Sequence, residues 1–354
     1  MKMTRFGPTW AAVAATVFFT SCSGSGSPPQ AGSAGDTVQI NGAGATFPNP
    51  IYTKWTSEYN KLHPNVKINY QSVGSGAGIR QLVNRTVFFG ASDQPMKDEQ
   101  LTSAPDTILH LPTVLGAVVP IYNVPGVTAE LKFTGLVLAD IVLGKITKWN
   151  DPALVKLNPD AKLPNLPLTF VHRSDGSGTT FIWADYLAKV SPEFKSKVGV
   201  DSALNWPAGV GAKGNEGVSG LVKQTPGALG YTEPAYANQN QIVFGSVQNA
   251  DGQFVKASAA TATAAAAGVA SNMPADFRVS ITNPPGPNAY PIASFTWMLF
   301  YENPQDKPQA RAMVEFMKWA LTDGQRFASE LGYAPLPENV VQLELKALER
   351  ITLQ

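Results

Sequence analysis

The sequence predicts an α/β fold with two lobes, in which helices pack against mostly parallel sheets. Three observations indicate this class. A chain of 354 residues is long for one domain of ordinary size and short for three. Hydrophobic residues make up 44% of the chain and charged residues only 15%, which provides enough apolar material for a large core. Runs with strand and helix periodicity also alternate along the sequence, as α/β proteins require.

The first part of the folded body, from about residue 37, shows this alternation clearly. Pro50 suits the first turn of a helix, and apolar side chains recur at helical spacing after it until the His-Pro pair at 63–64. Alternating apolar residues at 66–70 predict a half-buried strand. The next predicted elements are a glycine turn at 74–78, a helix carrying Ile79, Leu82 and Val83, and a buried strand at 87–91 that ends at Ser92-Asp93.

The middle of the chain repeats the pattern. An apolar run at 168–171 predicts a strand, residues 173–179 a tight turn, and residues 180–190 a helix. The alanine-rich tract at 257–270 predicts a surface helix.

The N-terminus has the composition of an export signal. Two cations precede an apolar run at 10–19 that is too short to span a bilayer, so residues 1–21 are predicted to be a signal peptide. Phe19-Thr20-Ser21-Cys22 resembles a bacterial lipobox, in which the cysteine is acylated, although Phe replaces the usual Leu. A plain secretory signal with an incidental cysteine is the alternative. Residues 22–36, rich in Ser, Gly and Pro, are predicted to be a flexible tether.

The charged and metal-ligating residues exclude several classes of partner. Lysine and arginine number 27 against 26 acidic residues, so there is no basic field to collect nucleic acid. One cysteine and three histidines provide neither a disulfide framework nor a multi-cysteine metal cluster. We therefore expect no nucleic-acid partner, no metal and no cofactor.

Three glycine-rich turns, at 42–47, 74–78 and 176–179, stand where a strand ends and a helix begins. Ligands bind at that edge of an α/β sheet, and helix N-termini there offer free N–H groups to an anion. The turns also carry hydroxyl groups. Together they favour an oxyanion site, although any single turn could serve only to connect a strand tightly to a helix.

Nucleotide and nucleophile motifs do not fit these turns. None continues as the Gly-Lys-Ser/Thr of a P-loop, Gly74-Ser75-Gly76 lacks the third glycine of a Rossmann turn, and Gly-x-Ser-x-Gly does not occur. His172 has no suitably placed nucleophile to serve as a general base and is interpreted as a structural or solvated residue.

Four motifs together resemble a known family. They are Gly42-Ala43-Gly44-Ala45-Thr46-Phe47-Pro48, Gly90-Ala91-Ser92-Asp93, Arg173-Ser174-Asp175-Gly176-Ser177-Gly178-Thr179 and Gln224-Thr225-Pro226-Gly227-Ala228-Leu229-Gly230-Tyr231. In this order and spacing they are similar to the phosphate-binding proteins, PstS, of the Pst ABC phosphate importers. The resemblance extends from about Val38 to the closing helix after Tyr333-Ala334-Pro335-Leu336-Pro337, which is nearly the whole mature chain.

The resemblance implies a type II periplasmic-binding-protein fold, the Venus-flytrap fold, with a mixed sheet flanked by helices in each lobe. Lobe I would comprise residues 37–113 and 290–354, and lobe II residues 114–289, with crossings near 111–116 and 289–294. The implied function is high-affinity binding of inorganic phosphate between the lobes and delivery to membrane permease subunits. We further expect a monomer that is not an enzyme, located in the periplasm or on the outer face of the cytoplasmic membrane, and the lipobox-like sequence predicts a lipid anchor on Cys22.

The family's phosphate contacts can be carried over one residue at a time. They fall on Thr46, Phe47 (backbone N–H), Ser75, Asp93, Arg173, Ser177, Gly178 (backbone N–H) and Thr179, while Asp175 would support Arg173. Three positions around the site depart from the family. Phe88 stands where an Asp is common, Glu216 lies in the usual Gly-Asn-Asp-Gly turn, and His172 replaces a frequent second cation.

Physical chemistry explains an aspartate at an anion site. Phosphate near neutral pH carries at least one proton and sulfate carries none, so Asp93 can accept a hydrogen bond only from phosphate. Taken alone, Asp93 could equally cap a turn or the helix predicted near Lys97. Arg173 could be a structural partner of Asp175, a role compatible with ligand binding.

Two functions from different classes therefore remain open. The first is a solute-binding lipoprotein that captures inorganic phosphate for a permease. The second is an extracytoplasmic sensor or a phosphate-ester hydrolase that uses the same pocket. The hydrolase would need an activated nucleophile or a metal, and the sequence shows neither.

Overall fold

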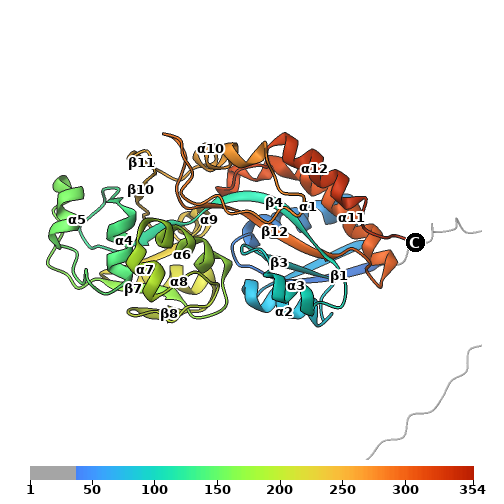
Figure 1. The fold of residues 1–354 in the computed structure, drawn as a ribbon, viewed down its shortest axis with the longest axis horizontal. Helices are drawn as coiled ribbons and strands as arrows, with labels where there is room; N and C mark the ends of the chain where they lie inside the picture. Colours follow the sequence, from blue (N-terminus) through green and yellow to red (C-terminus); the bar gives the residue numbers. More distant parts are fainter. Residues whose placement is uncertain (1–36) are drawn as a thin grey trace, which may run out of the picture. The chain divides into compact units, whose positions relative to one another are not determined.

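The computed structural model describes residues 37–354, arranged as three sheets with helices around them (Figure 1). The predicted signal peptide, Cys22 and the predicted tether lie outside these residues. Within residues 37–354, no helix has both the length and the apolar character needed to cross a bilayer.

The first sheet has five strands in the order β2-β1-β3-β12-β4. Strand β1 is parallel to β2 and β3, whereas β12 is antiparallel to both of its neighbours, so the sheet is mixed rather than mostly parallel. Gly44 pairs with Ala91, and the residues two positions further on, Thr46 and Asp93, therefore leave the sheet at the same edge. The strands are β1 (Val38–Gly44), β2 (Val66–Ser72), β3 (Phe89–Ser92), β4 (Ile108–Ala117) and β12 (Ala293–Tyr301).

The second sheet has four strands in the order β5-β9-β7-β8. Strand β7 is parallel to β8 and β9, and β5 is antiparallel to β9, so this sheet is also mixed. Its strands are β5 (Val119–Tyr122), β7 (Thr169–Arg173), β8 (Val210–Ala212) and β9 (Ala228–Thr232). A small third sheet contains β6 (Lys132–Phe133), β10 (Ser246–Gln248) and β11 (Phe254–Val255).

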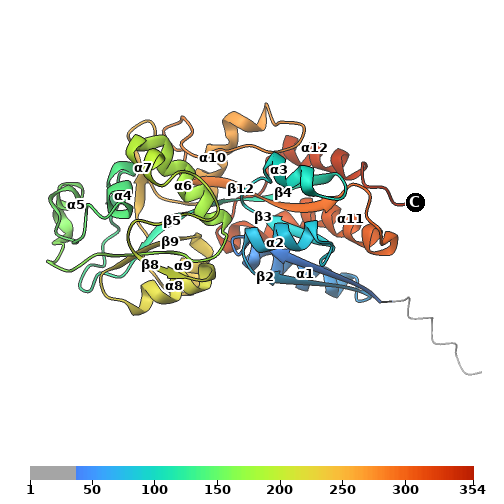
Figure 2. The same cartoon turned by 60° about the horizontal axis from the view of Figure 1, so that its bottom comes forward.

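The helices cover both faces of the two large sheets. Figure 1 shows α11 and α12 above the first sheet and α2 and α3 below it, and Figure 2 shows the second sheet between α6 with α7 and α8 with α9. The helices are α1 (Asn49–Leu62), α2 (Ser75–Val83), α3 (Asp98–Ser103), α4 (Gly135–Val142), α5 (Pro152–Leu157), α6 (Gly178–Val190), α7 (Pro192–Lys197), α8 (Gly214–Gln224), α9 (Pro234–Gln239), α10 (Ala259–Ala270), α11 (Lys307–Leu321) and α12 (Glu338–Leu348). Short 3₁₀ turns lie at Pro159–Ala161, Asp323–Phe327 and Ser329–Leu331.

The chain passes between the two large sheets in two places. Only Val118 separates β4 of the first sheet from β5 of the second, and its N–H donates to the carbonyl of Ile292, just before β12 returns to the first sheet. The first sheet is thus built from both ends of the described chain and the second from its middle. The exact division into residues 37–113 with 290–354 and residues 114–289 stays a prediction.

Most predicted elements are present, with shifted ends. The helix that starts at Pro50, the strand from Val66 and the alanine-rich helix are confirmed as α1, β2 and α10. The buried strand starts at Phe89 instead of Val87, because the chain first turns through Arg85, whose φ is 54°. Helices α2 and α6 begin inside the glycine turns that precede the predicted helices, which brings their N-terminal residues into the site.

Candidate functional site

The eight predicted contact residues lie together where β1, β3 and β7 end and where α2 and α6 begin. Parallel pairing sets this arrangement, since it brings the carboxyl ends of neighbouring strands to one edge. All eight are buried: Thr46, Phe47, Ser75, Asp93, Arg173, Ser177, Gly178 and Thr179. We call these residues the cleft cluster.

Arg173 links the two large sheets. Its Nη1 donates to Thr46 Oγ1 across the cluster at 2.9 Å and to Asn215 Oδ1 at 2.6 Å. Its Nε and Nη2 donate to the two carboxylate oxygens of Asp175 at 2.8 and 2.5 Å. Burial alone would raise the pKa of Asp175, but the hydrogen bonds and the charge of Arg173, together with the hydrogen bond from the Gly214 N–H, hold that pKa below its usual value. The predicted support of Arg173 by Asp175 is present in the structure.

These contacts determine how much of the arginine remains for a ligand. The guanidinium has five N–H donors. One on Nε, two on Nη1 and one on Nη2 are used within the protein, which leaves one on Nη2. A two-pronged contact from Arg173 to an anion would therefore require Nη1 to release Thr46 or Asn215.

Ser75 and Gly178 form a second link between the sheets. The Gly178 N–H, which is predicted to meet the ligand, donates to Ser75 Oγ at 3.0 Å in this structure and would have to be shared with a bound anion. A Cβ on Gly178 would lie 2.5 Å from Asp93 Cβ, and one on Gly74, whose φ is 92°, would lie 2.4 Å from Asp175 Oδ2. Glycine is needed at both positions because the two sides approach too closely for a side chain.

Asp93 is the acidic member of the cleft cluster and is 1% exposed. Its Oδ1 accepts a hydrogen bond from Thr296 Oγ1 at 2.7 Å, whereas its buried Oδ2 meets no donor among residues 37–354. Burial raises the pKa of Asp93 to about 7, against the opposing effects of Thr296 and Arg173. Helix α3 is preceded by Lys97, and no cap bond from Asp93 is involved, so the alternative in which Asp93 caps that helix is wrong.

The hydroxyl groups of the cluster accept hydrogen bonds from protein N–H groups. Thr46 Oγ1 accepts from Arg173, Ser75 Oγ from Gly178, and Ser177 Oγ from Thr180 N at 3.1 Å as the N-cap of α6. A hydroxyl has one hydrogen, and when its oxygen accepts from the protein that hydrogen stays free to donate. The hydroxyl hydrogens of Thr46, Ser75 and Ser177 are therefore free to donate to a ligand. The N–H groups that bond to the three oxygens fix the directions in which these hydrogens can point.

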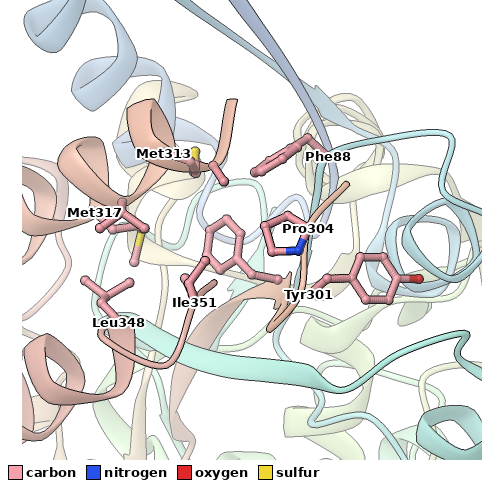
Figure 3. A pocket seen from close by; sticks show the side chains of 10 residues that line it. Phe88, Tyr301, Pro304, Met313, Met317, Leu348 and Ile351 are labelled. Carbon is pink, nitrogen blue, oxygen red and sulfur yellow. The ribbon is translucent and has the colours of Figure 1, made fainter. Parts of the chain in front are cut away.

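The three departures from the family pattern have different surroundings. Phe88 was expected near the site, but its side chain lines an apolar pocket with Met313, Met317 and Leu348 (Figure 3). Glu216 Oε1 lies 3.1 Å from the hydroxyl of Tyr236, which also reaches the carbonyl of Thr46 at 2.6 Å. Glu216 therefore borders the cluster.

His172 does not provide a second cation. Its ring stacks on Trp206 with centroids 5.1 Å apart, and burial lowers its pKa. This agrees with the interpretation of His172 as a structural residue.

Sequence reasoning missed three polar residues that surround the cluster. Thr296 from β12 bonds Asp93, Asn215 from α8 bonds Arg173, and Glu233 before α9 bonds Thr179 and Asn215. Asn215 stands in the Gly-Asn-x-Gly turn, and Glu233 closely follows the fourth motif, so both signals were available. Among the described residues, no group of three or more histidine, cysteine or acidic side chains could hold a metal ion.

Comparison with known proteins assigns the class first. A family model described as a PBP superfamily domain matches residues 29–323. The fold agrees with two solved structures that are less than 25% identical in sequence. A periplasmic phosphate-binding protein called PfluDING has a TM-score of 0.68 at 21% identity, with 88% of this chain and 93% of that chain covered. A phosphate-binding protein from Stenotrophomonas maltophilia has a TM-score of 0.66 at 17% identity, with 87% and 93% covered. The protein is thus a two-lobed α/β protein of the PBP superfamily.

Curated relatives define the family within that class. The phosphate-binding protein PstS of Pasteurella multocida is 48% identical over 304 residues, which cover 86% of this chain and 88% of the relative. PstS of Xylella fastidiosa strain Temecula1 is 46% identical, covering 86% and 84%, and PstS of Methanocaldococcus jannaschii is 39% identical, covering 93% and 91%. The chain belongs to the PstS family of phosphate-binding proteins, as its motifs predicted.

Proposed function

We propose that the protein binds inorganic phosphate in the cleft cluster and delivers it to the membrane subunits of an ABC phosphate importer. The ligand would be held by Thr46, Phe47, Ser75, Asp93, Arg173, Ser177, Gly178 and Thr179, with Asp175 supporting Arg173. The relatives named PstS support the ligand class, and the geometry of the cluster supports the choice of residues.

The observation that carries the proposal is that the buried Oδ2 of Asp93 has no hydrogen-bond partner among residues 37–354. A buried acceptor without a donor costs about 1 to 3 kcal/mol, and more when it is charged. A ligand that accepts from the surrounding hydroxyl and N–H groups and also donates one hydrogen bond would satisfy this oxygen. A protonated phosphate does both, whereas sulfate would bring only lone pairs to an ionised Asp93, the form that prevails above about pH 7.

A role as an enzyme has less support. The relatives are named as binding proteins, and ester hydrolysis would require an activated nucleophile or a metal. We therefore propose that the protein releases its ligand unchanged.

The place of action follows from the same assignment. We propose a monomer that works outside the cytoplasm and is anchored to the membrane by acylated Cys22. The mass of the exported protein, compared between wild type and Cys22→Ser, tests the anchor. Sedimentation with and without phosphate tests the monomer.

Calorimetric titration of the ligand-free protein tests the main proposal. Phosphate should bind tightly, sulfate should bind far more weakly, and a phosphomonoester should be recovered intact. Equal affinities for phosphate and sulfate would contradict the proposal that Asp93 selects phosphate by accepting a hydrogen bond from its proton. Release of phosphate from the ester would favour the hydrolase.

A further inference from the structure

Glu233 is a fully buried carboxyl group beside the cleft cluster, at 0% exposure. Its two oxygens have different partners. Oε1 lies 2.9 Å from Thr179 Oγ1, and Oε2 lies 2.5 Å from Asn215 Nδ2. Glu233 therefore contacts Thr179, one of the predicted ligand-binding residues, and is not itself predicted to contact the ligand.

The direction of the hydrogen bonds around Glu233 can be derived from Arg173. Arginine only donates, so Asn215 Oδ1, 2.6 Å from Arg173 Nη1, must accept. The amide NH₂ of Asn215 then points to Glu233 and donates to Oε2. A proton on Glu233 can consequently sit only on Oε1, between Glu233 and Thr179.

The protonation state of Glu233 decides where the Thr179 hydroxyl hydrogen points. Thr179 Oγ1 also accepts from Asn215 Nδ2 at 3.2 Å. If Glu233 is neutral, it donates to Thr179, both lone pairs of that hydroxyl are occupied, and its hydrogen is free for a ligand. If Glu233 is ionised, it takes the hydrogen for itself and leaves Thr179 with a lone pair to offer.

We propose that neutral Glu233 is the positioning residue that turns the Thr179 hydroxyl hydrogen toward the bound anion. This inference rests on the proposed phosphate site. In its ionised form Glu233 would withdraw one donor and place a second negative charge near an anion, and both changes weaken binding.

The surroundings of Glu233 favour the neutral form near neutral pH. Burial, helped by the charge of Asp93, raises the pKa of Glu233 to about 8, while Thr179 and Arg173 oppose the rise. The other titratable groups that face it are Tyr236 and Tyr333, and burial raises the pKa of each. A bound anion would raise the pKa of Glu233 further, so binding above pH 8 should take up a proton.

The test is calorimetric titration with inorganic phosphate from pH 6 to pH 9. The variant Glu233→Gln mimics the neutral acid, because its carbonyl can accept from Asn215 while its NH₂ donates to Thr179. We expect the dissociation constant of wild type divided by that of Glu233→Gln to rise about tenfold from pH 6 to pH 9, as Glu233 becomes roughly nine-tenths ionised in the free protein. Dividing the two constants removes the titration of phosphate itself, which affects both proteins.

Glu344→Gln is the matched control. Glu344 is another fully buried carboxyl group with a raised pKa, but it lies on α12, outside the cluster. This variant should keep the wild-type pH dependence of binding. The proposal would be overturned if the dissociation constant of wild type divided by that of Glu233→Gln stays constant or falls as the pH rises.

A second measurement does not depend on the variant's folding. Titrations at pH 9 in buffers with different ionisation enthalpies should show wild type taking up close to one proton per phosphate, since HPO₄²⁻ brings its own proton to Asp93. No uptake would also overturn the role of Glu233. Failure of wild type to bind phosphate at any pH would instead refute the proposed function.

Discussion

Asp93 and Arg173 show how single residues divide the work of anion recognition. Arg173 supplies charge but has four of its five N–H donors engaged by Asp175, Thr46 and Asn215. Asp93 supplies no attraction for an anion, yet its buried Oδ2 is an acceptor without a partner among the described residues. Affinity and selectivity therefore depend on different side chains.

Asp93→Asn should weaken phosphate binding and narrow the gap between phosphate and sulfate. The amide can turn an N–H toward an unprotonated oxygen, which the carboxylate cannot do. A site built around such a bond rejects the wrong ligand by roughly 10⁴ to 10⁵, and we expect most of that factor to disappear. Competition binding of the two anions measures it, with the exposed carboxylate change Asp98→Asn as the control. Full wild-type discrimination in Asp93→Asn would show that Asp93 does not read the proton of the ligand.

Arg173→Lys should weaken phosphate binding relative to wild type, although the substitution preserves the positive charge. A lysine has three donors at one point and cannot serve Asp175, Thr46 and Asn215 in the directions that the planar guanidinium serves. Each lost hydrogen bond to a charged group corresponds to about a tenfold to hundredfold loss of affinity.

Titration calorimetry with phosphate measures the affinities of wild type and Arg173→Lys. Arg350→Lys, the same substitution at a surface ion pair with Glu302, is the control and should keep wild-type affinity. Near-equal affinities of wild type and Arg173→Lys would return Arg173 to a purely structural role.

At the scale of elements, the sequence located strands and helices better than their ends. Periodicity predicted α1 and β2, because each buries one face of a regular element, and the alanine-rich composition of residues 257–270 predicted α10. Periodicity placed the starts of α2 and α6 too late because glycine and serine have no hydrophobic period, although Ser75 and Gly178 are already helical. Asn215 and Glu233 were missed although both stand beside recognisable motifs, because those motifs do not show that the two side chains reach Arg173 and Thr179 in the folded protein.

Helix α12 contains a buried carboxyl group, Glu344, whose two oxygens have no hydrogen-bond partner among the described residues. Burial raises its pKa well above the usual value, so it binds a proton in the folded protein that the unfolded chain has lost. Stability should then fall as pH rises from about 4.5 toward the folded-state pKa, by at most about 1.4 kcal/mol per pH unit.

Glu344→Gln should remove this contribution. The free energy of unfolding of the variant minus that of wild type should increase with pH across that window, as measured by urea denaturation at several pH values. A difference that does not change with pH would show that Glu344 keeps the same charge in both states.

For the whole molecule, the cleft cluster is also the place where the two large sheets are tied together. Thr46 with Arg173 and Ser75 with Gly178 are contacts between groups at the ends of different sheets. A ligand that needs donors from both sides can be satisfied only when both sides are close. The motifs predicted which residues come together in the cleft cluster. The close approach at Gly178 shows, in addition, that a side chain added at this position should keep the two sides apart.

Phosphate should shift the protein toward a more compact form, and Gly178→Ala should block that shift. The added methyl would lie 2.5 Å from Asp93 Cβ, whereas the backbone of Gly178, the first residue of α6, accepts alanine. The variant should fold but lose phosphate affinity, because the two sides can no longer approach.

Gly220→Ala on α8 is the matched control, since nothing lies within 4 Å of its Cβ position. Small-angle scattering of verified ligand-free protein, before and after adding phosphate, should show a smaller radius of gyration for wild type and Gly220→Ala but not for Gly178→Ala. An unchanged radius in wild type that binds phosphate would argue against hinge closure, and normal compaction of Gly178→Ala would show that this glycine does not limit it.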